Sequence, residues 1–512
     1  MIAEILSGLM SIFSLGPLTG IAVGVLTGLI FGAIPGISGI MAIAILLPMT
    51  FYVSPLIGIP MLLGIYKAGI FGGSISAILL NTPGAPPAVC TAMEGYPLTR
   101  KGQAGKALNT ALSASVFGDV FSNLLLIFVA APLSIITLKA GPAERFSIIV
   151  LALTVVGSIS GPSIIKGIIC AGVGIWLSTI GISETTGATR FVFGSSELIG
   201  GISLIPMVIG LLCLPEVLQQ VGQAYTAKKK KRLTLSQNRE DNRFTLRDFR
   251  YCLPTMIKSS FIGSFLGALP GLGASPAAFM AYSEAQRSSK RPEKFNRGAI
   301  DGLAAPEAAN NATTGSAMIP MLTLGIPGDD VTAILMGAFL IQGITPGPTI
   351  FYEHTHLIYG IFGGLLMCDL FLYLIAKMGF NLWIKLSQAP KHLIFSCVTV
   401  FCFVGAYSIN QSLFDIFTLI IFAIVGFLMK RYHFSAGAFI IGFILGPIWE
   451  RAFDQAMVIS DGSYSIFFTR PIPAIFLFLA LVSIISITRT RMKTNKLAME
   501  VDQLKASDQP NN

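Results

Sequence analysis

The chain has 512 residues, of which 53% are hydrophobic and only 12% are charged, and its formal net charge is +10. Soluble domains carry roughly twice this share of charge, and the basic residues fall in short loops, so we exclude a soluble enzyme and a nucleic-acid-binding protein. Apolar stretches of about 20 residues recur along the chain and are long enough to cross a lipid bilayer. We predict an all-α polytopic membrane protein with about 10–14 membrane segments.

Four short phrases containing Pro-Gly interrupt this apolar pattern. FGAIPGISG (31–39) and LGALPGLGA (266–274) share one form, whereas GGSISAILLNTPGAPPA (72–88) and TGSAMIPMLTLGIPGDDVTA (314–333) share another. Proline removes a backbone donor and clashes with the preceding helical turn. Each phrase is therefore predicted to break a helix, giving discontinuous or re-entrant segments.

The phrases recur in the same order, which indicates an internal repeat. Pro35 aligns with Pro270 at an offset of 235, and Pro83 aligns with Pro327 at an offset of 244. Further along, GDVFSNLLLI resembles CDLFLYLIA and pairs Asp119 with Asp369. We predict four regions, which are a first transmembrane repeat (1–221), a basic cytoplasmic linker (222–254), a second repeat (255–490) and a disordered cytoplasmic tail (491–512).

The positions of basic residues predict that the two repeats have opposite orientations. In the first repeat, Arg100, Lys101 and Lys106 follow the second phrase, whereas in the second repeat five basic residues at 287–297 lie between the phrases. No Lys or Arg occurs from 329 to 356. Positively charged loops stay in the cytoplasm, so equivalent loops face opposite sides, as in inverted-repeat transporters.

The broken segments are predicted to form a binding site. Backbone groups freed by a break are tolerated at membrane depth only inside protein or beside a wet cavity, and half-helix N-termini there face anions. Small and neutral polar residues surround the breaks. The substrate-binding candidates are Gly36, Ser38, Ser74, Ser76, Asn81, Thr82, Gly84, Gly271, Gly273, Ser275, Asn310, Asn311, Thr313, Ser316 and Gly328.

Carboxylates within apolar runs are candidates for coupling transport to a cation. These are Asp119, Glu307, Asp329 and Asp369. For Asp119 and Asp369, an interhelical hydrogen bond is an equally good interpretation. Lys67 could contact a substrate carboxylate, but a structural ion pair or a snorkelling side chain is the preferred interpretation. The seven cysteines form no C-x-x-C motif, so neither a metal site nor another cofactor is expected.

At these phrases the chain resembles the large permease subunit of the tripartite tricarboxylate transporters. The resemblance extends from about residue 17 to 485 and is carried by GAIPGISG, GALPGLGA, QGITPGP and the long phrase GLAAPEAANNATTGSAMIPMLTLGIPG. The chain departs from the family pattern at Glu184 and Val192, where Asp and Thr are more usual. These departures bear on substrate or partner detail.

The resemblance implies a bacterial inner-membrane uptake system for citrate-like di- and tricarboxylates. In such a system, the large subunit pairs with a small four-helix membrane subunit, and a periplasmic solute-binding protein delivers the substrate. Transport is driven by an ion gradient, usually of Na⁺. No ATP-binding G-x-x-x-x-G-K-[ST] motif occurs in the chain, which agrees with a secondary transporter.

Two other functions fit parts of the sequence. An intramembrane serine protease would use Ser38 as nucleophile, but it needs a nearby base, and none of the four histidines is predicted to lie within a span. An anion channel could also use broken helices. Saturable, cation-dependent uptake would distinguish a transporter from a channel.

Overall fold

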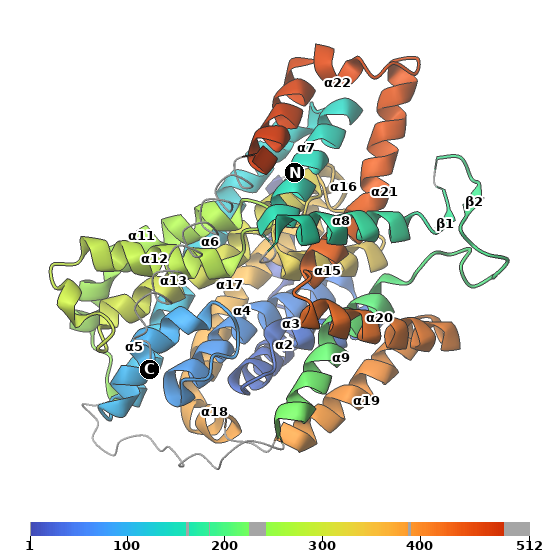
Figure 1. Cartoon of the computed structure of the whole chain (residues 1–512). Coiled ribbons are helices and arrows are strands. Elements are labelled where there is room, and N and C mark those ends of the chain that lie inside the picture. Colours follow the sequence, from blue (N-terminus) through green and yellow to red (C-terminus); the bar gives the residue numbers. More distant parts are fainter. Residues whose placement is uncertain (1, 160–162, 184, 225–241, 388–390, 486–512) are drawn as a thin grey trace, which may run out of the picture.

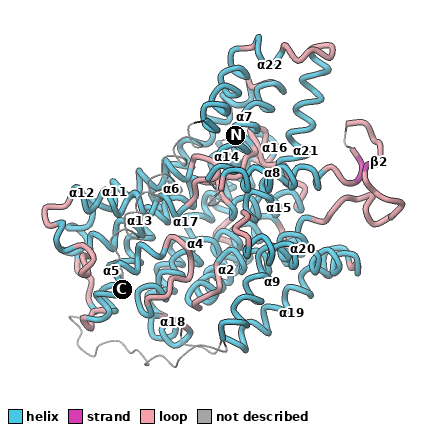
Figure 2. The backbone as a smooth tube through the Cα atoms, viewed as in Figure 1, coloured by secondary structure: helices cyan, strands magenta, loops and turns pink. Residues whose placement is uncertain are grey.

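The computed structural model describes residues 2–159, 163–183, 185–224, 242–387 and 391–485. These residues form a bundle of helices with a single small β-hairpin that extends from one side (Figures 1 and 2). The predicted all-helical fold is therefore confirmed apart from this hairpin, whose strands are two residues long.

The first half of the chain, up to the linker, contains nine α-helices among its described residues. They are α1 (Ile2–Ser11), α2 (Leu15–Ala33), α3 (Gly39–Leu46), α4 (Pro55–Leu80), α5 (Ala88–Arg100), α6 (Ala104–Leu138), α7 (Pro142–Ile159), α8 (Ile164–Ser178) and α9 (Leu204–Ala224), with the 3₁₀ helix η1 (Leu47–Tyr52) after α3. Strands β1 (Gly181–Ile182) and β2 (Thr189–Arg190) pair antiparallel between α8 and α9.

The second half begins with a helix that starts inside the expected linker. Its elements are α11 (Leu246–Gly267), α12 (Ala274–Ser288), η2 (Pro292–Lys294), α13 (Ile300–Ser316), α14 (Met318–Leu324), α15 (Asp330–Ile341), α16 (Ile350–Glu353), α17 (Thr355–Met378), α18 (Phe380–Leu386), α19 (Lys391–Asn410), α20 (Leu413–Arg431), α21 (Ala436–Ile459) and α22 (Ile466–Thr469), followed by a helix over 471–485. Thr245 and Asp248 form a capping box at the start of α11. Linker residues 225–241 and the expected disordered tail lie outside the described residues.

Six of the described helices are long and apolar enough to cross a membrane, and they are α2, α4, α6, α17, α20 and α21. The shorter apolar helices include α3 with η1, α8, α15 and 471–485. Because α6 spans 35 residues and α4 spans 26, both exceed the length needed to span a bilayer upright.

All four predicted helix breaks are present. The backbone leaves the helical conformation between α2 and α3, between α4 and α5, between α11 and α12, and between α14 and α15. Gly36 and Gly271, which occupy equivalent places in the first and third phrases, have φ of 91° and 86°. Only glycine adopts such values without strain, so the Pro-Gly pair both stops the helix and turns the chain.

Helices α4 and α13 form the interior of the molecule. In α13, every residue from Asp301 to Ser316 is buried, and 94% of the apolar window of α4 is buried. Small residues permit this close packing. A Cβ at Gly118 of α6 would lie 2.1 Å from the Ala308 carbonyl oxygen, and one at Gly263 of α11 would lie 2.2 Å from that of Ala309. The polar residues of α13 are therefore held in a densely packed interior.

Candidate functional site

A cavity of about 420 Å³ lies where the four helix breaks meet. Its walls include Ser38–Ile40 from the first break, Ala85–Pro87 from the second, Gly271–Pro276 from the third and Asp329–Val331 from the fourth. Segments from both halves of the chain thus share one cavity, which we call the central cavity.

Five helices begin at the central cavity. Their N-cap residues all line it, and they are Ser38 (α3), Pro87 (α5), Gly273 (α12), Asp329 (α15) and Ser435 (α21). A helix N-terminus presents unpaired N–H groups and about half a positive charge. Together the five ends contribute roughly +2.5 elementary charges at low dielectric, which favours a negatively charged ligand.

Two carboxylates face the same cavity. The Asp329 side chain accepts a hydrogen bond from the Thr332 N–H at 2.8 Å, and it accepts another from the Tyr66 hydroxyl at 2.6 Å. Asp330 packs against the start of α21, where a Cβ at Gly437 would lie 1.8 Å from its Oδ1. Among the described residues that line the cavity, none is Lys, Arg or His. The two aspartates therefore offset most of the positive potential of the helix ends.

Directly behind the cavity is a buried ion cluster. Lys67, the residue after Tyr66 on α4, places its Nζ 2.5 Å from Asp369 Oδ1 and 3.6 Å from Asp119 Oδ1. Asn123 Nδ2 donates to Asp369 Oδ2 at 2.6 Å, and the Thr314 hydroxyl donates to Asp119 Oδ1 at 2.6 Å. All these side chains are fully or almost fully buried. The cluster joins α4 and α6 of the first half to α13 and α17 of the second.

Glu307 lies in a second buried cluster, which contains hydroxyl groups. Its carboxylate accepts hydrogen bonds from Ser74 at 2.5 Å, from Ser115 at 2.7 Å and from Thr91. These donors come from α4, α6 and α5, and all four side chains are buried. The cluster ties α13 to three helices of the first half. Neither Glu307 nor its three donors line the central cavity.

The sequence-predicted residues therefore separate into groups. Ser38, Gly271, Gly273, Ser275 and Asp329 line the central cavity, whereas Ser74 and Glu307, and Asp119 and Asp369, belong to the two buried clusters. The remaining predicted residues do not line the cavity, and they are Gly36, Ser76, Asn81, Thr82, Gly84, Asn310, Asn311, Thr313, Ser316 and Gly328.

Several of these residues have contacts that indicate what they do. The hydroxyls of Thr313 and Ser316 bond to carbonyls of their own helix. Gly84 and Gly328 pack the second and fourth breaks against neighbouring backbone, since a Cβ at either would lie within 2.8 Å of a carbonyl oxygen. The Asn310 side chain is buried and has no hydrogen-bonding partner in the described structure.

Asn81 has a conformational role. It ends α4 in the left-handed region with φ of 51°, and its side chain is exposed. Gly325 ends α14 in the same way, with φ of 71°. The two positions are equivalent at the offset of 244 that aligns Pro83 with Pro327. Left-handed caps are usually Gly and sometimes Asn, so the residue type at 81 suits the backbone.

Sequence reasoning missed several residues of these sites. Asp330, Tyr66 and Ser435 line the cavity, and Asn123 completes the ion cluster. Asn123 follows Asp119 by one helical turn, a spacing that places both on one face. Ser435 gave no such signal, because its helix starts far from any Pro-Gly phrase and only the fold brings it to the cavity.

Comparison with known proteins identifies the family. The family model of the tripartite tricarboxylate transporter TctA family matches residues 18–441. The chain belongs to the TctA family. It is also 39% identical over 494 residues to an uncharacterized 52.8 kDa protein in the TAR-I ttuC' 3' region of Agrobacterium vitis, with 95% of each chain covered.

A second relative covers part of the chain. An uncharacterized protein in the TAR-II ttuC' 3' region of Agrobacterium vitis is 39% identical over 242 residues, which is 47% of this TctA-family chain and all of the relative. No solved structure matches. Membership identifies the chain as a multi-pass membrane component of a tripartite tricarboxylate transporter and as a transport protein, not an enzyme. The protease interpretation of Ser38 is accordingly wrong, and the Ser38 hydroxyl instead caps α3 by accepting from the Met41 N–H.

Proposed function

We propose that this chain is the permease of a cation-coupled secondary transporter that binds citrate-like di- or tricarboxylates in the central cavity. The observation that carries the proposal is the convergence of five helix N-termini on one cavity formed by all four breaks. Neutral N–H and hydroxyl donors can hold a carboxylate without burying an arginine or lysine in the membrane.

The cavity chemistry supports coupling to a cation, for which Na⁺ is our candidate. Asp329 and Asp330 would repel a substrate carboxylate unless their charge were neutralised. A cation bound beside Asp329 would remove that repulsion, so substrate and cation would each strengthen the binding of the other. Discontinuous helices in other secondary transporters hold anion and cation side by side in this way.

Asp119 and Asp369 are a second candidate cation site with a different charge balance. Two carboxylates and one ammonium leave one negative charge when all three groups are ionised, and Asp119 Oδ2 has no hydrogen-bonding partner in the described structure. A proton or a metal cation at Asp119 would balance the cluster. Because Lys67 already contacts both carboxylates, we assign Asp329 the larger role in coupling.

Two reciprocal contacts support an inverted repeat. Lys101 Nζ donates to the Arg297 carbonyl oxygen at 2.5 Å, joining the loop after the second phrase to the loop between the third and fourth. In the opposite sense, Gln342, which follows the fourth phrase, donates to the carbonyl of Val53 at 3.2 Å and to that of Thr50. Thr50 and Val53 lie between the first and second phrases. Each contact exchanges the roles of the halves, as a pseudo-two-fold axis requires.

The basic side of the molecule is proposed to face the cytoplasm. Lys101 beside Arg297, and Lys106 beside Asp248 at 3.0 Å, gather basic loops of both halves. By the positive-inside rule this face is cytoplasmic, in a bacterial inner membrane, with the C-terminus also inside. As in the family, the proposed partners are a small membrane subunit and a periplasmic solute-binding protein.

The test is uptake of labelled citrate and succinate by proteoliposomes that contain the chain with its partner subunits. A transporter gives saturable uptake that an inward Na⁺ gradient stimulates, whereas an anion channel gives uptake that follows the membrane potential alone. Ser275→Trp fills the cavity and is expected to abolish uptake. Ser283→Trp, on an exposed position of the same helix, is the matched control. Equal activity of the two variants would place the substrate elsewhere.

A further inference from the structure

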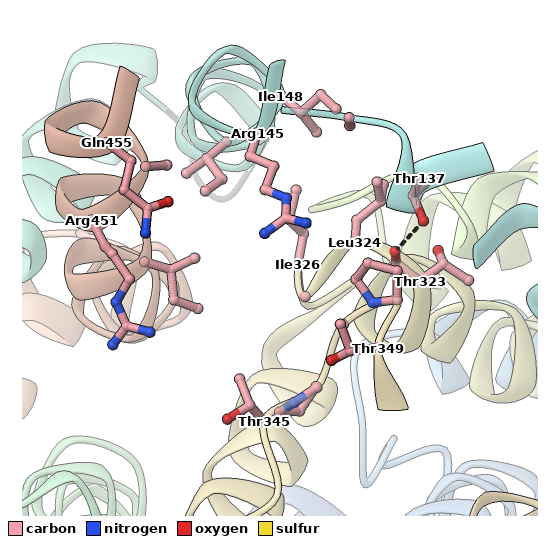
Figure 3. A pocket seen from close by; sticks show the side chains of 18 residues that line it. Thr137, Arg145, Ile148, Thr323, Leu324, Ile326, Thr345, Thr349, Arg451 and Gln455 are labelled. Carbon is pink, nitrogen blue, oxygen red and sulfur yellow. Dashed lines mark hydrogen bonds between the residues drawn. The ribbon is translucent and has the colours of Figure 1, made fainter. Parts of the chain in front are cut away.

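A second cavity, of about 160 Å³, lies on the other side of the fourth break. It is enclosed by α7, by α21, by the end of α14 at Thr323–Ile326 and by the segment Thr345–Thr349 (Figure 3). The Thr137 hydroxyl donates to the Thr323 carbonyl oxygen at 2.8 Å and closes one wall. We call this space the peripheral cavity.

Arginine side chains line the peripheral cavity. Arg145 reaches into it from α7, and Arg451 and Gln455 lie on the facing wall, on α21 (Figure 3). Within the described part of the chain, no Asp or Glu lines it, and Arg145 forms no ion pair. Arg190 and Arg470, from the same end of the molecule, are paired instead with Glu450 and Glu144. The guanidinium group of Arg145 and several hydroxyls surround a cavity whose described lining contains no carboxylate, and such a cavity is suited to an anion.

We propose that the peripheral cavity is a separate carboxylate-binding site, which holds the substrate before it reaches the central cavity. The inference rests on the proposed function, because it assumes a carboxylate substrate. Guanidinium groups bind carboxylates through paired hydrogen bonds. The cavity volume corresponds to about five water molecules, so it accommodates one or two carboxylate groups of a small acid.

Neighbouring stretches of the fourth break line the two cavities. Thr323–Ile326 line the peripheral cavity and Asp329–Val331 line the central one, so Pro327 and Gly328 lie between them. The Gly328 carbonyl accepts a hydrogen bond from the Gly271 N–H at 2.7 Å, which fastens the fourth break to the third. A displacement of this short segment would connect the cavities without unwinding a helix.

Helix α7 contacts both sites. Arg145 faces the peripheral cavity, while Val156 packs against the third break, its Cα lying 2.7 Å from where a Cβ on Gly271 would be. These residues are eleven positions apart, about 16 Å along a helix. The peripheral site is therefore close enough to supply the central cavity and too far from it for a small acid to occupy both.

The proposal is tested by measuring how charge controls access to the peripheral cavity. Thr345, which lines it, is replaced by cysteine in a Cys397→Ser background, since Cys397 is the exposed native cysteine among the described residues. The purified full-length chain in detergent, which leaves both faces accessible, is labelled with a sulfonate-bearing and with a trimethylammonium-bearing methanethiosulfonate. Rates are normalised to those with free cysteine.

We expect the anionic reagent to be favoured by about tenfold, and we expect citrate to slow labelling. Arg145→Gln with Arg451→Gln should remove both effects, whereas Arg145→Lys with Arg451→Lys should keep the anionic preference. Arg470→Gln makes a charge change at the same end of the molecule but outside the cavity, and should change neither effect. Equal labelling by both reagents, or labelling that citrate does not slow, would overturn the proposal.

The two proposals fail separately. Labelling needs no transport, so a carboxylate site in the peripheral cavity would be detected even if the reconstituted chain took up neither citrate nor succinate. Conversely, Na⁺-stimulated uptake with unselective labelling would retain the proposed function and remove the peripheral site.

Discussion

The two proposed anion sites, the central and the peripheral cavity, differ in the groups that would attract an anion. The central cavity relies on backbone N–H groups at five helix ends and sets two aspartates against them. The peripheral cavity relies on two arginines and, among its described lining residues, has no opposing carboxylate. From this difference we expect the peripheral cavity to bind a carboxylate without a cation, and the central cavity to bind one well only together with a cation.

The largest expected effect concerns the ion cluster behind the central cavity. Lys67→Met leaves Asp119 and Asp369 buried without their ammonium partner, which costs about 3–5 kcal/mol for a broken buried pair. Thermal unfolding of the detergent-solubilised protein measures the loss. Adding Asp369→Asn should restore much of it, because the cluster then carries less unpaired charge. A Lys67→Met protein as stable as the wild type would show that the cluster does not hold these helices together.

The next largest effect is expected on the Na⁺ dependence of citrate uptake. Asp329→Asn keeps a side chain that can cap α15 but removes the negative charge, so Na⁺ stimulation of citrate uptake should fall by about a hundredfold, corresponding to the loss of one charged contact of about 2–3 kcal/mol. Uptake is measured against Na⁺ concentration in proteoliposomes.

Tyr66→Phe serves as the control for Asp329→Asn, because it removes the 2.6 Å hydrogen bond to Asp329 and leaves the charge. For Tyr66→Phe, Na⁺ stimulation of citrate uptake should fall only several-fold, since a single hydrogen bond to a charged group is lost. If Asp329→Asn kept the Na⁺ response of the wild type, the central cavity would bind carboxylate without help from that residue, and the contrast between the cavities would fail.

A smaller effect is expected from the peripheral cavity. Arg145→Gln with Arg451→Gln should raise the substrate concentration for half-maximal uptake by about tenfold, because capture loses two cations. The maximal rate should change little, since the central cavity is untouched. Kinetics over a range of citrate concentrations separate these parameters. A fall in maximal rate at unchanged half-saturation would argue that the arginines act in the transport step itself.

The smallest effect tests Asn81. If its backbone conformation matters, Asn81→Gly should retain uptake, because glycine also adopts the left-handed cap, while Asn81→Ala should cost about 1 kcal/mol of stability. If its side chain binds substrate, both variants should lose uptake. Gly325 has no side chain at the equivalent position, and we therefore expect Asn81→Gly to be active.

The sequence was sufficient to locate the breaks but not the sites they form. Pro-Gly phrases act on the local backbone, and so Gly36, Gly271 and their neighbours could be identified directly. Which polar side chains would share a cavity depends on packing between distant helices. For that reason Ser435 was missed, and Asn310 and Asn311 were grouped with a cavity whose lining does not include them.

The sequence identified some of the functionally interesting charged residues, but not their partners. Asp119 and Asp369 stood out because carboxylates are rare in apolar runs. The sequence did not show that Lys67 is the ion-pair partner of either one. Arg145 was not among the basic residues from which the orientation was predicted, and only the packing of α7 against α21 shows that it lines a cavity.

The ion cluster restricts which helices of this protein can move relative to one another. Lys67, Asp119 and Asp369 join helices from both halves of the chain. Moving the two halves apart at this cluster would leave unpaired charges buried in a non-polar interior. In the proposed secondary transporter, we therefore expect α4, α6 and α17 to move as one body. The shift in accessibility then falls to the short non-helical segments and to the helices that lie outside that body.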